Sequence, residues 1–306
     1  MKHMKRGFTL IEISLFLALT GLLFMGIVVG TGRSVAQQRF FDATQNYAEF
    51  LRRIYSQVAN PQSAGNGASE MAIYGKMISF GQKVDLAGND TPGDEQWVYV
   101  YDVVGSAEGA ISGDAVGSLK GVGASVVTEE KNSLGNTIAV KPAGLVEAYE
   151  PKWGATIETT DMKTTEQKRA GNNNLYTGTI LVVRHPRSGT INTLVSSAVI
   201  DVNRLVRTAN NTLTGANIQN AKSALTAVLG YNSTDARAFK TQAVDFCVNP
   251  EGVNVAGASR WDIRLVKNAR NASGVEVIDL DALSMDSSTS VINRCRVSNW
   301  QQVEGI

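Results

Sequence analysis

The sequence is poor in the residues on which most catalytic and metal-binding sites depend. Its 306 residues include 2 histidines and 2 cysteines, and the cysteines do not form a CxxC pair. No GxxxxGK[ST] phosphate loop occurs, and neither His3 nor His185 has a serine or cysteine nucleophile at a recognisable spacing. His185 precedes Pro186 and is expected to be a surface residue of a turn. The sequence therefore predicts a protein that is not an enzyme and that uses no metal or cofactor.

A strong net charge is also lacking. The chain carries 29 Lys and Arg against 28 Asp and Glu, for a formal net charge of +1. This balance gives no sign of a nucleic-acid partner. Hydrophobic residues make up 43% of the chain, which is enough for a sizeable folded core.

Proline is scarce, and none of the 6 prolines precedes Pro61. Apolar residues run from Phe8 to Gly32, and Glu12 is the only charged residue among them. Residues 13–32 form an uncharged run of about the 20 residues that a helix needs to cross a bilayer core of roughly 30 Å. Lys2, Lys5 and Arg6 precede the run. Since positive charge stays inside, we expect a single-pass protein of the cytoplasmic membrane with a cytoplasmic N-terminus and its remainder outside.

A cleaved secretory signal peptide is the alternative interpretation, because the chain has a basic start, an apolar stretch and a Ser34-Val35-Ala36 step. Three features oppose it. The apolar run exceeds the roughly 7 to 15 residues of a signal sequence, Arg33 lies where a cleavage region is small and neutral, and Glu12 lies near the front of the run. A membrane anchor is therefore favoured.

Glu12 is the most informative residue. A carboxylate in the apolar part of a membrane helix costs roughly 2.5 to 3.5 kcal/mol on insertion scales, so it suggests a functional site with a cationic partner. No Lys, Arg or His lies within a turn or two on its C-terminal side. Either the partner comes from elsewhere or Glu12 lies in the head-group zone and is solvated there.

The segment Lys-Arg-Gly-Phe-Thr-Leu-Ile-Glu, residues 5–12, resembles the leader junction of type IV pilins and type II secretion pseudopilins. The resemblance covers about the first fifty residues. It implies that a prepilin peptidase removes the leader, residues 1–7, by cutting between Gly7 and Phe8 and then methylates the new amino group of Phe8. The Phe8 amine of the same chain or of a neighbouring subunit would neutralise Glu12, and the resemblance favours the neighbour, so that the pair sets the register of assembly. Other pilin subunits and a pilus assembly platform are the implied partners.

A single N-terminal helix is expected over residues 8–59, with residues 8–32 as its transmembrane and assembly segment. Beyond the membrane, apolar residues recur at spacings of three, four and seven, which is typical of a helix with one buried side: Phe40, Tyr47, Leu51, Ile54 and Val58. Roughly fifty residues would span about 75 Å. The related family often has a proline in the membrane half, which this chain lacks. Its weak points there are glycines, and any local melting on assembly is expected at these residues: Gly21, Gly26, Gly30 and Gly32.

Residues 60–306 are expected to form a β-rich head outside the cytoplasm. The predicted strands are residues 71–80, 97–104, 125–128, 155–160, 243–248, 262–266 and 275–280, with a hairpin of residues 176–184 and 190–200 around a turn at 186–189 and a helix over 217–229. The fold class is therefore α+β and pilin-like, with a long N-terminal helix packed on an antiparallel sheet.

Cys247 and Cys295 are the only cysteines, and outside the cytoplasm such a pair is more often bridged than free. A bridge would close a loop of about 48 positions, which contributes roughly 4 kcal/mol in the chain-entropy model. Many type IV pilins have a C-terminal disulfide loop of this kind. Two buried free thiols are the alternative.

Three functions stay open at this point. The first is a subunit of an extracellular pilus that polymerises through its N-terminal helix and supports adhesion, twitching motility or DNA uptake. The second is a pseudopilin of a type II secretion system, and the third is a minor pilin at the filament tip that acts as an adhesin. A head of about 250 residues favours a minor or specialised subunit. Glu12 argues against the tip-most pseudopilin, which by resemblance lacks this residue.

Overall fold

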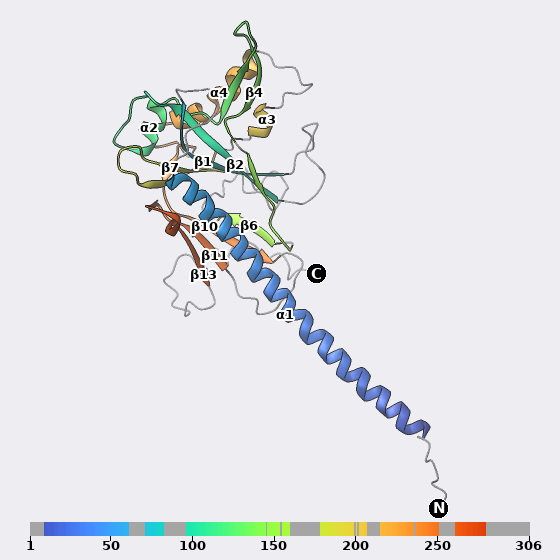
Figure 1. Ribbon diagram of the computed structural model, residues 1–306. Helices are drawn as coiled ribbons and strands as arrows, with labels where there is room; N and C mark the ends of the chain where they lie inside the picture. The colour runs from blue at the N-terminus through green and yellow to red at the C-terminus, as the bar shows by residue number, and fades with distance from the viewer. Residues whose placement is uncertain are drawn as a thin grey trace, which may run out of the picture.

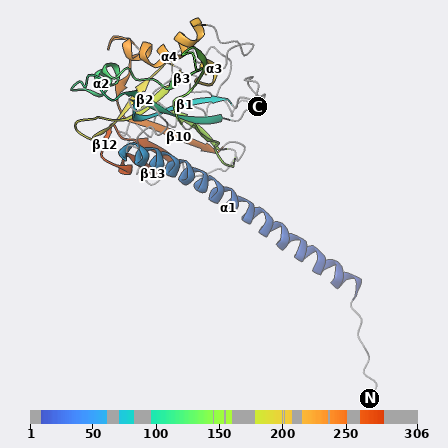
Figure 2. The same ribbon diagram turned by 45° about the horizontal axis from the view of Figure 1, so that its top comes forward.

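The protein consists of one long helix that carries a β-rich head over its C-terminal half (Figures 1 and 2). The structure is a computed structural model that describes residues 9–60, 71–82, 96–144, 146–153, 155–159, 178–198, 200, 202–206, 215–235, 237–250 and 261–279. The prediction of an α+β fold with an N-terminal helix and an antiparallel sheet is confirmed.

Helix α1, Leu10–Ala59, is 50 residues long. Thr9 caps its start and Asn60 its end, directly before Pro61, which agrees with the predicted helix. The helix runs without a break through the four glycines of its apolar half, and the first residue of the predicted helix, Phe8, lies outside the described residues. Its N-terminal part projects from the head, and its C-terminal part crosses the head (Figure 1).

The strands form three antiparallel groups. The largest is a seven-stranded sheet in the order β12-β8-β7-β1-β2-β5, with β9 also paired to β8. Its strands are β1 Met71–Gln82, β2 Gln96–Ser106, β5 Glu147–Tyr149, β7 Thr179–Arg184, β8 Ile191–Ser196, β9 Lys240–Thr241 and β12 Asn268–Ala269. A four-stranded sheet has the order β13-β11-β10-β6, with β6 Ala155–Thr159, β10 Val244–Pro250, β11 Trp261–Leu265 and β13 Val275–Asp279. A separate hairpin pairs β3 Val127–Lys131 with β4 Thr137–Pro142.

The large sheet separates two hydrophobic cores. On one face, Ile78, Val100 and Ile180 pack with the C-terminal half of α1 and with the four-stranded sheet. On the other face, Met77 and Leu181 pack with the short helices and with the β3–β4 hairpin. These short helices are α2 Ala115–Gly121, α3 Val202–Val206 and α4 Gly215–Gly230, whereas the 3₁₀ turn η3 Ala272–Gly274 contacts α1. Because both faces are covered, β7 is buried along almost its whole length and reads as a continuous apolar run.

The buried side of α1 follows the predicted spacing. Phe40, Tyr47, Leu51, Ile54 and Val58 are each 7% exposed or less. The β7–β8 hairpin and helix α4 also form where the sequence predicts them. The strand expected at residues 125–128 begins at Val127 instead, and Ser125 makes an isolated bridge to Val104.

Candidate functional site

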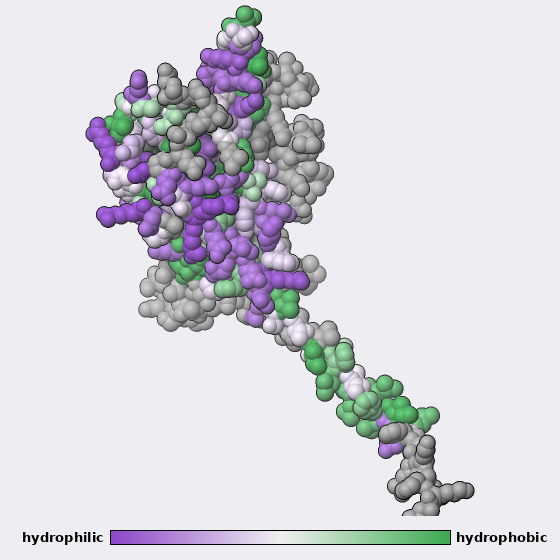
Figure 3. Space-filling model, in the orientation of Figure 1, coloured by the Kyte–Doolittle hydropathy of each residue, from purple (hydrophilic) through white to green (hydrophobic). Residues whose placement is uncertain are grey.

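The N-terminal part of α1 is a fully exposed apolar helix. Residues Leu10–Ile27 have a mean hydropathy of 2.2, and none of them is buried in the protein. This segment alone, among the described residues, is long and apolar enough to cross a membrane. Figure 3 shows the contrast between this apolar extension and the largely hydrophilic surface of the head. Exposure of so much apolar surface to water is unfavourable in free energy, so this segment needs a covering of lipid or of other protein.

Glu12 lies at the start of this apolar segment and forms a capping box with Thr9. The Glu12 carboxylate accepts hydrogen bonds from the backbone N–H and the hydroxyl of Thr9, both at 3.1 Å, and the Glu12 N–H donates to the Thr9 hydroxyl at 3.3 Å. This arrangement satisfies two free donors of the helix start. This capping box was not predicted, although a threonine followed three residues later by a glutamate is its known sequence signal.

The capping box changes the interpretation of Glu12 without removing the need for a counter-charge. Its carboxylate is hydrogen-bonded within its own chain, but among the described residues no ion pair involves Glu12. Gly7 and Phe8, at the predicted cleavage and methylation site, lie outside the described residues. Their processing therefore stays a prediction, as does the pairing of Glu12 with the Phe8 amine.

The docked half of α1 is fixed to the large sheet by an ionic cluster. Arg53 of α1 donates to Glu147 of β5 at 2.7 Å, and Gln57 donates to the other oxygen of Glu147 at 2.9 Å. Behind them, the Lys76 ammonium lies 2.7 Å from Asp102 and 3.9 Å from Glu147. Lys76 and Asp102 are buried, so removal of one partner leaves an unpaired charge away from water. The cluster thus holds α1 in one position along the sheet.

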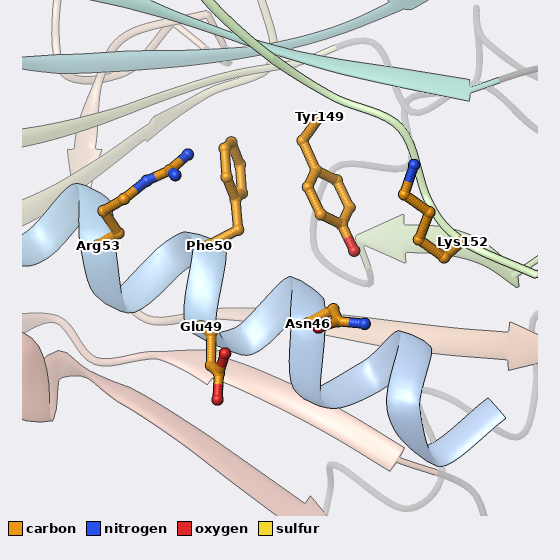
Figure 4. Close-up of a pocket in the computed structure, with 6 residues that line it drawn as sticks. All are labelled: Asn46, Glu49, Phe50, Arg53, Tyr149 and Lys152. Atoms are coloured by element: carbon orange, nitrogen blue, oxygen red, sulfur yellow. The ribbon is translucent and has the colours of Figure 1, made fainter. Parts of the chain in front are cut away.

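A shallow groove of about 470 Å³ lies between α1 and β5 (Figure 4). Phe50 and Tyr149 stack at its floor with their ring centroids 4.7 Å apart, and burial raises the pKa of Tyr149 to about 12. The remaining lining residues are Asn46, Glu49, Arg53 and Lys152. The lining thus combines two aromatic rings with charged and amide side chains.

His185 does not have the surface position that was expected. Its side chain is 8% exposed, because the turn between β7 and β8 folds it inward. Its Nδ1 accepts the backbone N–H groups of Arg187 and Ser188, and Nε2 lies 3.2 Å from the carbonyl oxygen of Ser112. Both ring nitrogens therefore hold backbone in place, and the role of His185 is structural.

Cys247 lies in β10, is 2% exposed and takes part in a disulfide. Cys295, the partner expected from the sequence, lies outside the described residues, and the pairing stays a prediction. Within the described part of the chain, no group of three or more His, Cys, Asp or Glu side chains could hold a metal ion.

Comparisons with protein-family models, with curated proteins and with solved structures return no match. The class of the protein therefore rests on its own residues. The described structure defines an α+β head on a helix that is long and apolar enough to anchor it in a membrane.

Proposed function

We propose that this chain is a subunit of a type IV pilus or of a closely related pilus-like filament. In this proposal the fold is pilin-like, and the apolar half of α1 lies in the membrane before assembly and in the filament core afterwards. The observation that carries the proposal is the exposed apolar half of α1 with one carboxylate, Glu12, at its start. The Lys5-Arg6-Gly7-Phe8 leader junction supports it, because a lone anchor needs neither that junction nor a charge in its apolar segment.

The proposed assembly step pairs Glu12 with the methylated amine of Phe8 in a neighbouring subunit. A prepilin peptidase creates that amine, and an assembly platform adds the subunit from the membrane. In a lipid-lined or dry filament core, water no longer screens either charge, so amine and carboxylate attract each other strongly. A subunit placed one step out of register leaves both charges unpaired. The pair therefore selects one register.

The test of this proposal separates the charge of Glu12 from its role in the capping box. Glu12→Gln keeps an acceptor for the Thr9 donors and removes the charge, Glu12→Leu removes the charge and the side-chain acceptor, and Thr9→Val removes the hydroxyl of the cap and keeps the charge. We expect all three variants to insert and to be cut before Phe8. Both Glu12 variants should fail to enter filaments, because an unpaired charge in a dry core costs roughly 3 to 5 kcal/mol. Thr9→Val should still assemble.

Each variant is expressed in the native host, and three quantities are scored separately: protein in the membrane fraction, the N-terminal peptide by mass spectrometry, and incorporation of this subunit into sheared filaments. Normal incorporation of Glu12→Gln together with loss of Glu12→Leu would show that the cap is what matters, and charge pairing would be wrong. A mature chain that begins at Gln37 would show cleavage by signal peptidase and would contradict the whole proposal.

A further inference from the structure

We propose that the head docks on the outer membrane–water interface through a collar of aromatic side chains around α1, with Arg39 facing lipid phosphate. The collar consists of Phe41, Trp153 and Trp261, together with Arg39. This inference rests on the proposed membrane anchoring of α1, and it adds a second contact between the protein and the lipid before assembly.

The collar places a tryptophan on each flank of the helix at one level. Arg39 and Phe41 are two residues apart on α1, so they point to nearly opposite sides. The Arg39 guanidinium lies over the ring of Trp153, 5.0 Å from its centroid. On the other flank, the ring of Phe41 meets Trp261 edge-on, with centroids 5.4 Å apart. The head thus places one tryptophan on each of two flanks of the helix near the point where it emerges.

Two of these rings are open to the surroundings, whereas Trp261 is partly buried against the core. Trp153 is 58% exposed and Phe41 is 43% exposed, whereas Phe40 between them is buried against the head. Trp153 also has a φ of 61°, in the left-handed region that a bulky residue avoids at a cost of roughly 1 to 2 kcal/mol. The loop after β5 therefore holds a large apolar ring outward under strain. Strained and exposed aromatic residues are typical of contact sites.

The height of the collar matches the interface. If residues 13–32 fill the hydrocarbon core, Arg39 lies about 10 Å beyond its outer edge along the helix, at 1.5 Å per residue. The head groups occupy roughly 5 to 7 Å on each side of the core, and helices in membranes are tilted by about 20° on average. A tryptophan side chain at the level of Arg39 is long enough to cover the few ångströms that remain between Arg39 and the head groups. Tryptophan is enriched at this level because its ring is apolar while its N–H is polar.

The charge of the helix segment favours lipid over a second protein copy. Between Glu12 and Asp42 the only charged residues are Arg33 and Arg39. Arg39 lies just above the expected head-group level, where a basic side chain extends toward phosphate. The collar is also joined covalently to the segment that spans the bilayer, so the membrane surface is always within reach.

The experiment measures the depth of Trp153 in bilayers that contain brominated phospholipids, which quench tryptophan fluorescence on contact. The full chain is reconstituted with Trp153 as its one tryptophan and with phenylalanine in place of Trp97, Trp261 and Trp300. We expect emission to fall with bromine near the glycerol level and to fall less with bromine at the chain ends. A chain with Trp97 alone is the matched control, since Trp97 belongs to β2 and not to the collar, and it should stay bright.

A further chain, with tryptophan only at Leu23→Trp, separates this inference from the proposed function. If this residue is quenched by deep bromine while Trp153 is not quenched by either lipid, the anchor stands and docking is wrong. If Leu23→Trp is not quenched, the membrane anchor itself is wrong. Protection of Trp153 from brominated lipid and from aqueous iodide alike would show that protein covers the ring, which also overturns lipid docking. Should the background variant fail to fold, the difference in quenching between the natural chain and Trp153→Phe gives the same answer.

Discussion

At the scale of single residues, two tyrosines on the buried side of α1 differ in their hydrogen bonding. The Tyr55 hydroxyl donates to Thr193 at 2.5 Å, and Thr193 in turn donates to the carbonyl oxygen of Val266 at 2.8 Å. This chain of bonds links α1 to β8 and to the segment after β11. The Tyr47 hydroxyl is equally buried but has no hydrogen-bond partner among the described residues. The same atom type therefore stabilises the fold at one position and costs free energy at the other.

We predict opposite effects of the same substitution at these two positions. Tyr55→Phe should lower the free energy of unfolding by about 1 kcal/mol, because it removes a made hydrogen bond. Tyr47→Phe should raise it or leave it unchanged, because no bond is lost and the buried hydroxyl disappears. Urea unfolding of the two variants and of the natural chain measures the difference. A loss at Tyr47 as large as that at Tyr55 would show that the Tyr47 hydroxyl has a partner after all.

The pH dependence gives the Tyr47 variant a second readout. Burial raises the pKa of Tyr47 well above its usual value of 10, so the unfolded chain loses this proton at a lower pH than the folded chain. The contribution of the Tyr47 proton to the free energy of unfolding is therefore fully present below about pH 10 and is lost as the pH rises further. Tyr47→Phe should reduce this alkaline loss, which a change in packing alone would not do.

At the scale of elements, the position of α1 depends on its contact with the turn η3. Gly274 packs against the ring of Tyr55, and a Cβ at this position would overlap Cε1 and Cδ1 of the ring and lie 2.8 Å from the Cβ of Ala269. The absence of a side chain thus allows η3 to approach the helix closely. By contrast, a Cβ at Gly21, in the exposed half of α1, would meet nothing within 4 Å.

We predict that Gly274→Ala destabilises the head by about 1 to 3 kcal/mol, the usual cost of an added methyl group in a packed core. Thermal unfolding followed by near-UV circular dichroism measures the change. Gly21→Ala is the matched control and should leave the melting temperature of the head unchanged, although it favours the helix by about 1 kcal/mol. Equal effects of the two substitutions would contradict this account of how α1 docks.

The elements that the sequence predicts well have strong local signals. The spacing from Phe40 to Val58 marks one side of a helix, and Pro186 to Gly189 mark the turn of a hairpin between two β-branched runs. Helix α2 was missed because its sequence, Ala-Val-Gly-Ser-Leu-Lys-Gly, has low helix propensity and depends on the Asp114 cap and on packing.

Contacts between distant segments could not be predicted, because the sequence alone does not show which strands are neighbours. Lys76, Asp102 and Glu147 meet only once β1, β2 and β5 pair, and Trp153 meets Arg39 only once the head is folded. At the candidate site, Glu12 was recognised from the sequence and its capping partner Thr9 was not. The former stands out by its charge, whereas the latter is one threonine among many.

At the scale of the whole molecule, strands β10, β11 and β13 join the rest of the head where β10 pairs with β6, and we predict that a disulfide between Cys247 and Cys295 closes a loop near the C-terminus. The variants Cys247→Ala and Cys295→Ala should each destabilise the protein by roughly 4 kcal/mol at most, because either one opens the loop. Cys247 is also buried, so Cys295→Ala is the cleaner test. Thermal unfolding with and without reductant measures the effect. A Cys295→Ala variant as stable as the natural chain, or both thiols recovered free after alkylation before lysis, would rule out this bridge.

The way α1 enters the head determines how the molecule responds to pulling. The helix lies along the core from Phe40 to Val58, while its exposed end points away from the head (Figure 1). A force along the helix axis therefore loads all of these contacts in shear at the same time, together with the Arg53–Glu147 ion pair and the Tyr55–Thr193 bond. Contacts loaded in parallel share the force, whereas contacts peeled from one end break in turn. A head attached in this way resists tension along its helix far better than a sideways pull on the same helix end.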